Sequence, residues 1–554
     1  MELQNGPCAD EVNYLIIGSG FGGSVMAAEL ATRRRGVCLF ERGKAYPPGS
    51  FPRRVMEIDD SIWAPGFGKH GMFDLWSFDG IDAVTASGLG GGSLIYANVM
   101  LEKPAQWFTQ PVPDGNGKTE TWSFTHRDLR DHYRAVREVL QVQEIPQSLH
   151  EEHSKKTTKF LDAGSVLAPL AVRFDGADGP AKGAPLPPAD YPNIHGDDVE
   201  RTTCTMCGEC DVGCNRGAKS SLDHTYLSMA AHHGAQICVR TEVREIAPCT
   251  DDSDYLFEVA YVVHPECRNK SEPVEGVIRA KRVILAAGTL GSTYLMLRSK
   301  KLGLSDCAAL GKRFCGNGDL LGFALPDGDD DELLPSGGPV ITTYRSYDEG
   351  ERRILLQDGG LPNLATWGWG PDDLREALAK LSVPRFASAW LRRLRWPLPL
   401  LGMGADIPDG QLCLKDSDDT KMTCTWKKHT SDKHFQDVAR RMEALTKDLG
   451  AGFLRNFLWD FINEVITVHP LGGCPADTSA QEGVVDSYGR VRGVPGLWIT
   501  DGSVMPGPVG ANPSLTIAAF ARRAAHELRK EDLATPSLPA PFIPQPYGDS
   551  DRSG

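Results

Sequence analysis

The chain has 554 residues, which corresponds to about three or four domain-sized units. Hydrophobic residues make up 41% and charged residues 24%, a balance that excludes a disordered chain, a collagen and an integral membrane protein. Acidic residues outnumber basic residues by 73 to 59, and the resulting net charge of −14 disfavours nucleic acid as a partner.

The N-terminal residues predict neither a secretion signal nor a membrane helix. The first apolar run, Tyr14 to Ile17, is short and leads directly into glycines, whereas a signal peptide needs a longer apolar region and a cleavage site. No later stretch reaches the about 18 apolar residues of a membrane helix. We therefore expect a cytoplasmic protein without a transmembrane segment, in which most cysteines are reduced or bind a metal.

The first predicted elements form a βαβ unit. Residues 12–17 are a short, continuous apolar run typical of a buried strand. Residues 24–35 are rich in alanine and end on three arginines, which suits a helix and its C-terminus. Residues 37–40 form the second strand, and Glu41 follows it directly. The order of these elements predicts the start of a Rossmann-like α/β domain.

A glycine motif, Gly18-x-Gly20-x-x-Gly23, lies between the first strand and the helix. The first glycine permits a tight turn, the second lets a pyrophosphate approach the backbone, and the third lets the helix pack against the strand. The helix N-terminus then faces the phosphates, and Glu41 accepts a hydrogen bond from a ribose hydroxyl. Because strand, helix and acid all stand in place, the motif predicts a dinucleotide site.

Three features favour FAD over NAD in this site. The chain is long, a second glycine cluster occupies residues 88–92, and residues 497–503 form a strand that ends in Asp501-Gly502. A flavin is larger than a nicotinamide and needs backbone contacts from distant parts of the chain.

Several later segments have a distinct composition. Residues 282–288 predict a strand that runs into a glycine turn, residues 177–192 are too rich in Pro and Gly for regular structure, and residues 326–338 form an acidic turn region. Residues 380–404 are basic and apolar together, which favours an amphipathic helix packed on the body over a lid or a transient membrane-surface contact. Residues 531–554 are expected to be a Pro-rich tail.

Seven segments in order resemble one enzyme family. They are residues 18–23 with Glu41-Arg42-Gly43, SGLGGGSLIYANV (87–99), GAKSSLDHTYL (217–227), VILAAGTLGST (283–293), LGKRFCGNGD (310–319), VHPLGGC (468–474) and LWITDGSVMPGPVGANPSLTIAAFA (497–521). The chain resembles the glucose–methanol–choline (GMC) oxidoreductases, specifically their bacterial cholesterol oxidase-like branch. The family usually has Asn in the second glycine motif, where this chain has Tyr96.

The resemblance implies two domains. A Rossmann-like FAD-binding domain is assembled from residues 10–45, 80–110, 200–316 and 465–530. An α+β substrate domain with a mixed or antiparallel sheet takes residues 46–79, 111–199 and 317–464. No His lies in residues 87–99, so we expect FAD to bind non-covalently. The residues expected to contact it are Gly18, Gly20, Phe21, Gly22, Gly23, Glu41, Arg42, Gly88, Gly91, Gly92, Ser93, Asn98, Val243, Gly288, Asp501, Gly502, Asn512, Pro513 and Thr516.

Alcohol oxidation by a flavin needs a hydride acceptor, flavin N5, and a base for the hydroxyl proton. By resemblance His469, in Val468-His469-Pro470, is the base. Asn512, in Ala511-Asn512-Pro513, would orient the substrate oxygen.

The predicted substrate is a lipophilic alcohol such as a sterol or terpenoid. Residues 317–465 are rich in aromatic side chains, which would line a bulky apolar pocket or simply fill a core: Tyr344, Trp367, Trp369, Phe386, Trp390 and Trp396. Sterol oxidases of the family also isomerise their product through a Glu of the substrate domain. Residues 381–415 contain no Glu, only Asp406 and Asp409 as acids, so no coupled isomerisation is expected.

Four cysteines fall within eleven residues, at Cys204, Cys207, Cys210 and Cys214. The spacing C-x2-C-x2-C-x3-C is that of ferredoxin-type iron–sulfur sites, except that Asn215 replaces the usual proline. Three or four of these thiolates would bind a [3Fe-4S] or [4Fe-4S] cluster; zinc and unligated structural thiols are the alternatives.

The cysteines decide between three functions. With a cluster, the protein is expected to be a dehydrogenase that passes electrons to an acceptor protein. With structural cysteines, it is an oxidase that reduces oxygen to hydrogen peroxide. The third alternative, a non-catalytic electron-transfer module, is disfavoured by the presence of both His469 and Asn512.

Overall fold

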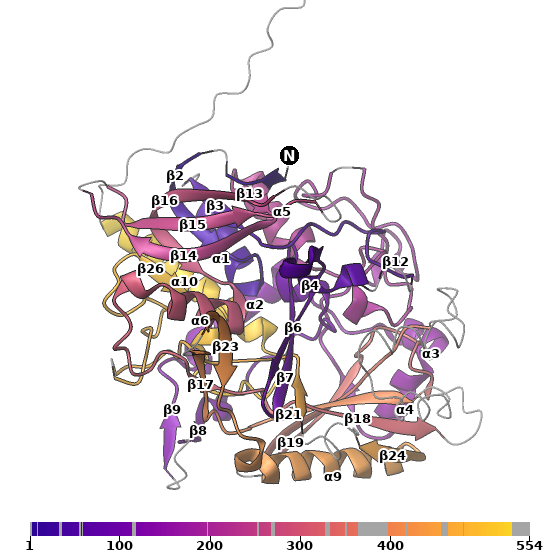
Figure 1. Cartoon of the computed structure of the whole chain (residues 1–554). Helices are drawn as coiled ribbons and strands as arrows, with labels where there is room; N and C mark the ends of the chain where they lie inside the picture. Colours follow the sequence, from indigo (N-terminus) through magenta and orange to yellow (C-terminus); the bar gives the residue numbers. More distant parts are fainter. Residues whose placement is uncertain are drawn as a thin grey trace, which may run out of the picture.

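The computed structural model describes residues 3–534, except 8, 33–35, 55–56, 58, 113–117, 197, 252–253, 267–271, 327–332, 350–351, 364–396, 416–417, 456–463 and 480. The two largest sheets of the described structure each pack against helices (Figure 1). In the view of Figure 1 one sheet lies at the top and the other at the bottom.

The first sheet combines a parallel and an antiparallel part. Its strands run in the order β1 (Gln4–Asn5), β13 (Gln236–Val239), β3 (Val37–Phe40), β2 (Glu11–Ile17), β16 (Val274–Leu285), β15 (Phe257–Val263) and β14 (Thr241–Pro248), and β26 (Leu497–Ile499) also pairs with β16. Each neighbouring pair among β1, β13, β3, β2 and β16 is parallel, and so is the pair β16 and β26. The pairs β16 with β15 and β15 with β14 are antiparallel. This confirms the Rossmann-like α/β sheet.

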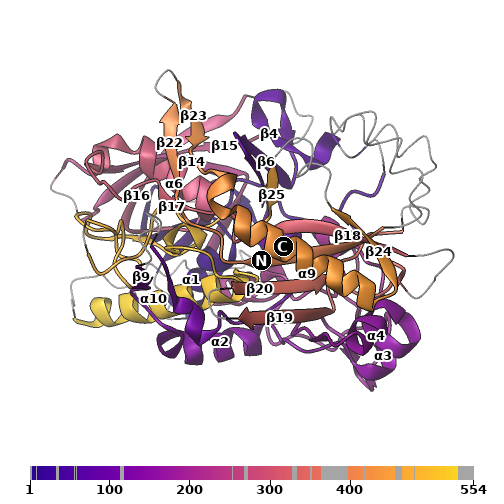
Figure 2. The same ribbon diagram turned by 90° about the horizontal axis from the view of Figure 1, so that it is seen from below.

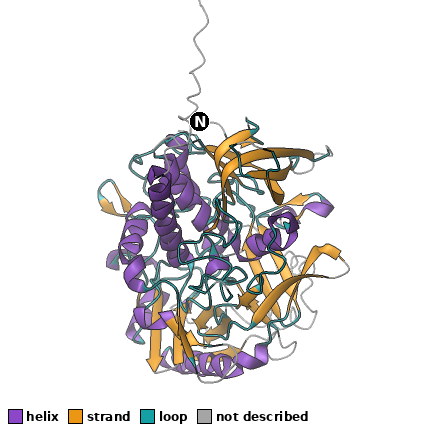
Figure 3. Ribbon diagram, turned by 90° about the vertical axis from the view of Figure 1, so that its left-hand side faces the viewer, coloured by secondary structure: helices purple, strands orange, loops and turns teal. Residues whose placement is uncertain are grey.

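Helices stand beside the upper group of strands in Figure 3. α1 (Phe21–Ala31) contacts α5 (Tyr226–His232) and the long α10 (Ser514–Ala534), which also contacts α2 (His126–Val139). α1 begins three residues earlier than the sequence predicted, and its predicted basic end, residues 33–35, lies outside the described residues. The predicted strands at 12–17 and 37–40 are confirmed, and their apolar residues are buried because helices and further strands surround them.

The second sheet is antiparallel. Its order is β10 (Val166–Leu167), β19 (Thr343–Glu349), β20 (Arg352–Asp358), β21 (Leu398–Gly404), β18 (Leu320–Pro326) and β24 (Ala451–Arg455). Helix α9 (Asp432–Asp448) crosses this sheet and contacts four of its strands (Figure 2). All six strands fall within the segments expected for the substrate domain, although the exact domain division stays a prediction.

Smaller elements join the two sheets. One three-stranded sheet contains β25 (Val465–Thr467), β7 (Ile81–Ala86) and β6 (Phe73–Phe78), and another contains β17 (Lys312–Phe314), β22 (Gly410–Lys415) and β23 (Asp418–Cys424). The remaining helices used below are α3 (Gln147–His153), α4 (Lys155–Asp162) and α6 (Gly288–Arg298). β25 matters for function because it ends two residues before His469.

The structure can be compared with the predictions for two segments, residues 177–192 and 380–404. Residues 177–192 are mostly irregular, apart from β12 (Gly179–Pro180), which pairs with β11 (Asp175–Gly176). The amphipathic segment at 380–404 is described only from residue 397, where it forms β21; the helix expectation is therefore wrong for that part, and any membrane-surface contact stays a prediction.

Helix α10 (Ser514–Ala534) extends into the segment expected to be a tail. Helix α10 continues to Ala534, past the predicted start of the tail at residue 531, and residues 535–554 lie outside the described part. Within the described residues, no helix is both long and apolar enough to cross a membrane.

Candidate active site

The first glycine motif forms a tight turn with one open side. Gly18 has φ +99°, and a Cβ on Gly23 would lie 1.9 Å from the Gly18 carbonyl oxygen, so both positions require glycine. A Cβ on Gly22 would lie 2.3 Å from the carbonyl oxygen of Thr500. A Cβ on Gly20, in contrast, would meet no described atom within 4 Å. Gly20 is also the N-cap of α1 and gives that helix no side-chain cap, so the helix N-terminus faces this space.

The second glycine cluster lies directly against the first. A Cβ on Gly91 would be 2.7 Å from the Cα of Gly20. Ser19 connects the two loops, because its Oγ accepts a hydrogen bond from the Gly90 N–H at 2.9 Å and donates to Glu41 at 2.5 Å. Ser19 carries no sequence signal of its own, because its role depends on a loop that lies about 70 residues away in the chain.

Glu41 is buried and hydrogen-bonded within the protein. Its carboxylate accepts hydrogen bonds from the Ser19 N–H at 3.1 Å and the Gly43 N–H at 2.8 Å, in addition to the Ser19 hydroxyl. Contact of Glu41 with a ribose stays a prediction. Arg42 is turned toward Asp74, with which it pairs at 2.6 Å. Val243 lies on β14, whose first residue donates its N–H to the Glu41 carbonyl oxygen.

Asp501 ties the C-terminal motif to the start of α6. One carboxylate oxygen accepts from the Gly288 N–H at 2.9 Å and from the Ser292 hydroxyl, and the other accepts from the Ser503 N–H at 2.9 Å and the Ser503 hydroxyl at 2.6 Å. Burial raises the pKa of Asp501, and these hydrogen bonds act in the opposite direction. The structure thus brings residues 288 and 501–502 together, as the flavin prediction requires.

His469 is positioned by a buried carboxylate. Its Nδ1 lies 3.0 Å from Oδ1 of Asp319, whose side chain is only 1% exposed. The other oxygen of Asp319 accepts from the Thr467 hydroxyl and from the Val468 N–H, both at 3.0 Å. His469 also donates its backbone N–H to Thr467 Oγ1 at 2.9 Å. The imidazole is thus fixed on its Nδ1 side.

Asn512 is held by a second buried amide. The Gln357 side chain, on β20, donates to Asn512 Oδ1 at 2.8 Å, and Asn512 Nδ2 donates back to Gln357 Oε1 at 3.3 Å. Both side chains are buried. Gln357 was not predicted from the sequence.

One loop, residues 315–319, contacts His469 and the two residues that precede Asn512. Asp319 bonds His469, while Asn317 donates to the Ala511 carbonyl oxygen at 3.0 Å and accepts from the Gly510 N–H at 2.8 Å. The loop lies in the segment LGKRFCGNGD (310–319), which is one of the seven segments that resemble the family. None of its residues is among the catalytic or FAD-binding residues predicted from the sequence. The acids and amides of that segment were the available signal for these two positioning residues.

Comparison with known proteins identifies similar chains. Two family models, each described as GMC oxidoreductase, match residues 190–315 and 408–521. A cholesterol oxidase from Acinetobacter baumannii is 26% identical to the chain over 93% of this chain and 94% of that protein. A cholesterol oxidase from Mycobacterium tuberculosis (strain CDC 1551 / Oshkosh) is 27% identical over 93% of this chain and 90% of that protein.

The chain belongs to the GMC oxidoreductase family. A further relative, 6'''-hydroxyparomomycin C oxidase from Streptomyces lividus, is 26% identical over 94% of this chain and 92% of that protein. Among solved structures, pyridoxine 4-oxidase from Mesorbium loti matches with a TM-score of 0.54 and 14% identity, over 94% of this chain and 99% of that chain. That likeness supports the fold. This GMC oxidoreductase is therefore an enzyme, and its family binds FAD.

The residues of this GMC oxidoreductase fit FAD. Asn98 is fully buried with φ +69°, and neither of its side-chain polar atoms has a hydrogen-bond partner among the described residues. Such orphaned groups are costly unless a ligand satisfies them. Like Gly20, both Gly92 and Gly288 face space that no described atom fills within 4 Å of an added Cβ. Glycines with open space, an uncapped helix N-terminus and an unsatisfied amide together form a cradle for a dinucleotide.

Other predicted FAD contacts are occupied by internal partners. Ser93 Oγ donates to the Gly90 carbonyl oxygen and accepts from the Leu222 N–H, and Thr516 pairs with the Tyr133 hydroxyl at 3.2 Å. Phe21 packs edge-on against the ring of Tyr96. Gly88 lies in the second glycine cluster, and Gly502 lies in the loop that begins at Asp501. Pro513 directly precedes α10. Direct flavin contact by these residues stays a prediction.

Asp406 lies beneath the loop that holds the catalytic candidates. Its Oδ2 accepts from the Gly316 N–H at 2.8 Å, and its Oδ1 has no partner among the described residues. Burial raises the pKa of Asp406 to about 8, with a further contribution from the charge of Asp319. Among the aromatic residues proposed for the substrate pocket, Tyr344 packs against the hydrophobic core, and the other five lie outside the described residues.

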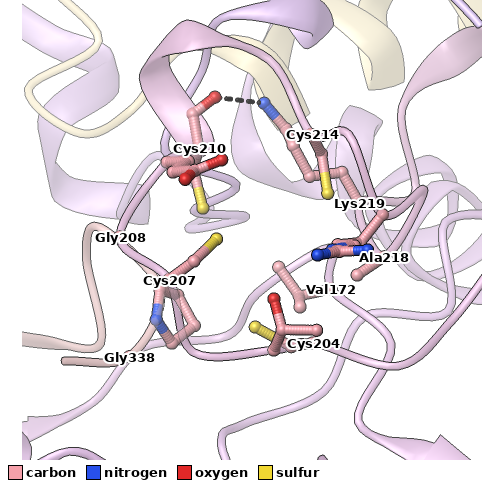
Figure 4. A pocket seen from close by; sticks show the side chains of 13 residues that line it. Val172, Cys204, Cys207, Gly208, Cys210, Cys214, Ala218, Lys219 and Gly338 are labelled. Carbon is pink, nitrogen blue, oxygen red and sulfur yellow. Dashed lines mark hydrogen bonds between the residues drawn. The ribbon is translucent and has the colours of Figure 1, made fainter. Parts of the chain in front are cut away.

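The four cysteines of the C-x2-C-x2-C-x3-C run line one cavity, shown in Figure 4. None of the described cysteines of the chain forms a disulfide. Burial raises the pKa of Cys207 to about 12 and also raises the pKa of Cys204 and of Cys210.

A separate group of three potential metal ligands lies close by. His195, Asp223 and His224 are the only described group of three whose ligand atoms all lie within 4.8 Å of one another. His195 Nε2 bonds Asp223 at 2.7 Å, and burial lowers the pKa of His224 to about 3. These contacts explain the group as a buried hydrogen-bonded support for residues 193–195.

Proposed function

We propose that this GMC oxidoreductase is an FAD-dependent enzyme that oxidises the CH–OH group of a lipophilic alcohol to a carbonyl. When bound, FAD supplies the hydride acceptor at its N5 atom. The observation that supports the proposal is that one loop, residues 315–319, hydrogen-bonds His469 through Asp319 and the backbone of residues 510 and 511, next to Asn512, through Asn317.

The chain's own residues would handle the hydroxyl proton. The Asp319 carboxylate accepts hydrogen bonds from Thr467 and Val468 and therefore acts as an acceptor toward His469 as well. This arrangement keeps the proton of the neutral imidazole on Nδ1 and leaves the Nε2 lone pair to take the substrate proton. Asn512, held by Gln357, would orient the alcohol oxygen.

The proposed substrate class is a sterol, terpenoid or similar apolar alcohol. Its support is the likeness to two cholesterol oxidases over nearly the whole chain. The competing class is a polar amino-sugar alcohol, because a relative of equal coverage is named 6'''-hydroxyparomomycin C oxidase. Anaerobic stopped-flow traces of flavin bleaching with cholesterol, with 1-dodecanol and with paromamine would distinguish the two classes. Bleaching by any of them also excludes a non-catalytic electron-transfer module.

The assignment of the base is tested by His469→Ala. We expect flavin reduction by the best substrate to fall about 100-fold or more, the usual contribution of a general base, while FAD remains bound. Near-normal reduction in the variant would overturn the assignment. His126→Ala is a matched control, since that histidine pairs with Glu102 outside the site.

Two routes are open for the electrons. Each alcohol oxidised releases two electrons and two protons; oxygen takes up both to give hydrogen peroxide, whereas a one-electron acceptor protein is reduced twice and the protons enter solvent. An iron–sulfur cluster in the cysteine run would favour the second route. Oxygen uptake, compared with reduction of ferricenium under argon, decides between them. We also propose a cytoplasmic location, which unpaired cysteines favour.

A further inference from the structure

The cysteine run is folded into a cage by its backbone. Met206 and Gly208 have φ values of +58° and +70°, and Gly213 has φ +88°. A Cβ on Gly213 would lie 2.0 Å from the ring of Phe51, so only glycine fits at position 213, directly before Cys214. These reversals turn the four sulfur atoms toward one cavity, as Figure 4 shows.

The cage is pinned to two other parts of the chain. Cys204 donates its N–H to the Arg173 carbonyl oxygen at 2.8 Å. Gly208 donates to the Gly338 carbonyl oxygen at 3.0 Å, and the Gly338 N–H donates to Met206 at 3.3 Å. Besides the four cysteines, the cavity is lined by Val172, Thr205, Gly208, Glu209, Arg216, Ala218, Lys219, Gly338 and Pro339. Such fixed geometry is what a preformed metal site needs.

The structure explains why Asn215 stands where ferredoxin-type runs have proline. Its side-chain amide accepts from the Phe51 N–H at 2.9 Å and donates to the Phe51 carbonyl oxygen at 3.0 Å. Proline makes neither bond. The asparagine in place of proline therefore binds the backbone of Phe51 to the end of the cysteine run. The spacing of the four cysteines is the same as in the motif.

The sulfur atoms are placed to act as acceptors. Met206 donates its N–H to Cys204 Sγ at 3.4 Å. The backbone of Glu209 is hydrogen-bonded to Cys207, and the backbone of Val340 is hydrogen-bonded to Cys210. Backbone N–H groups aimed at sulfur stabilise anionic, metal-bound thiolates and are a standard means of tuning iron–sulfur clusters.

The separation of the sulfurs distinguishes the metals. A single tetrahedral zinc with Zn–S bonds of about 2.3 Å holds its sulfurs about 3.8 Å apart. Among the described residues, no three of the four cysteines bring their sulfurs within 4.8 Å of one another. A cluster of several irons lies between its ligands and holds them farther apart than one ion does. The sulfurs as placed therefore do not form a single-ion zinc site, and the spacing in sequence is the one typical of an iron–sulfur cluster.

Lys219 joins the cage to the glycine cradle. Its ammonium donates to the carbonyl oxygens of Cys210 at 2.9 Å, Tyr96 at 2.8 Å and Leu94 at 3.1 Å, and it lies 4.7 Å from the centre of the Tyr96 ring. Leu94 and Tyr96 directly follow the second glycine cluster. Lys219 is 2% exposed, so its charge acts at short range on both loops.

We propose that Cys204, Cys207, Cys210 and Cys214 ligate an iron–sulfur cluster of the [4Fe-4S] or [3Fe-4S] type, and that Lys219 is the buried cation that offsets its negative charge beside the FAD cradle. The metal site rests on the cage alone, and only its neighbour depends on the proposed function. A cluster here is a one-electron centre packed against a two-electron cofactor site.

The test is iron and acid-labile sulfide analysis of the full chain, purified anaerobically and reconstituted with ferrous iron and sulfide. We expect about three or four irons per chain with matching sulfide. The double variant Cys204→Ser/Cys210→Ser should lose about tenfold or more of both. The matched control Cys413→Ser/Cys424→Ser, on β22 and β23, should retain them.

Three results would overturn the cluster. They are stoichiometric zinc without sulfide, equal iron in the double variant and its control, and no metal with all four thiols reacting in the native protein. FAD content and bleaching by alcohol are recorded on the same samples, so failure of the cluster and failure of the proposed function are separate outcomes.

The role of Lys219 is tested by the midpoint potential of the cluster, followed by electron paramagnetic resonance. Lys219→Met should lower the potential because a nearby positive charge is lost, while Lys219→Arg should shift it less. An unchanged potential in Lys219→Met with iron still bound would overturn this part of the proposal.

Discussion

Asp319→Asn tests how His469, the proposed base, is oriented. In the native protein Oδ2 of Asp319 receives two hydrogen bonds, from Thr467 and Val468, and Oδ1 receives one, from His469. An asparagine has one oxygen and one amino group. Because two donors face the Oδ2 position, the amide oxygen should stay there and the amino group should face His469. The imidazole must then accept at Nδ1, which moves its proton to Nε2 and removes the base.

The size of the effect follows from the bond that is lost. Hydrogen bonds to charged groups contribute about 1.5–3 kcal/mol. If that contribution is fully expressed in the transition state, flavin reduction should slow about 10-fold to 160-fold. Since Asp319 is 1% exposed, solvent should not replace the carboxylate. The fall should appear in kcat, with KM little changed, because Asp319 acts through His469 and does not itself bind substrate.

The assay is anaerobic stopped-flow reduction, with FAD absorbance and the thermal midpoint measured on the same samples. Asp406→Asn is the control, since it makes the same chemical change beside the same loop without contact to His469. A reduction rate for Asp319→Asn within about threefold of the native protein, with FAD bound, would refute the reasoning. Equal losses in both variants would indicate a disturbed loop instead.

Two further predictions concern the cradle and stability. Gly20→Ala should leave the thermal midpoint of the apoprotein unchanged but weaken FAD binding about tenfold or more. Gly23→Ala should destabilise the fold itself, because its Cβ would lie 1.9 Å from the Gly18 carbonyl oxygen. Thermal unfolding and FAD titration measure both effects, and equal effects of the two variants on folding would contradict the assignment of the open side to Gly20. Asp406 has a raised pKa of about 8, so the folded state retains a proton that the unfolded chain releases near 3.8; its stabilisation is complete below that value and is lost as pH rises toward 8. Asp406→Asn should therefore gain thermal midpoint relative to the native protein as pH rises from about 5 to about 8, and a pH-independent difference would contradict the buried, neutral carboxyl.

Local features could be read from the sequence because their physical requirements are local. Gly18 and Gly23 contact each other within one turn, so steric exclusion of Cβ acts over five residues. The buried strands β2 and β3 follow from short apolar runs. The cysteine run is defined by spacing alone, and its convergence on one cavity requires only glycines that turn the chain between the ligands.

Positioning residues, in contrast, could not be identified in this way. Asp319 and His469 are 150 residues apart, and Gln357 and Asn512 are 155 apart. An isolated Asp or Gln has no sequence pattern that names its partner. For Glu41 the motif predicted a ribose, whereas the structure shows hydrogen bonds to Ser19 and Gly43 that orient the carboxylate.

The amino-acid sequence by itself determined the βαβ cradle, the family, the two catalytic candidates and the four clustered cysteines, because each depends on residue types at short spacing. Only the tertiary structure decided which carboxylate faces His469, which amide holds Asn512, and that Lys219 links the cysteine cage to the chain that follows the second glycine cluster. These contacts arise where distant segments of an acidic 554-residue chain cross, and burial there makes each buried charge or amide depend on a partner that only folding supplies.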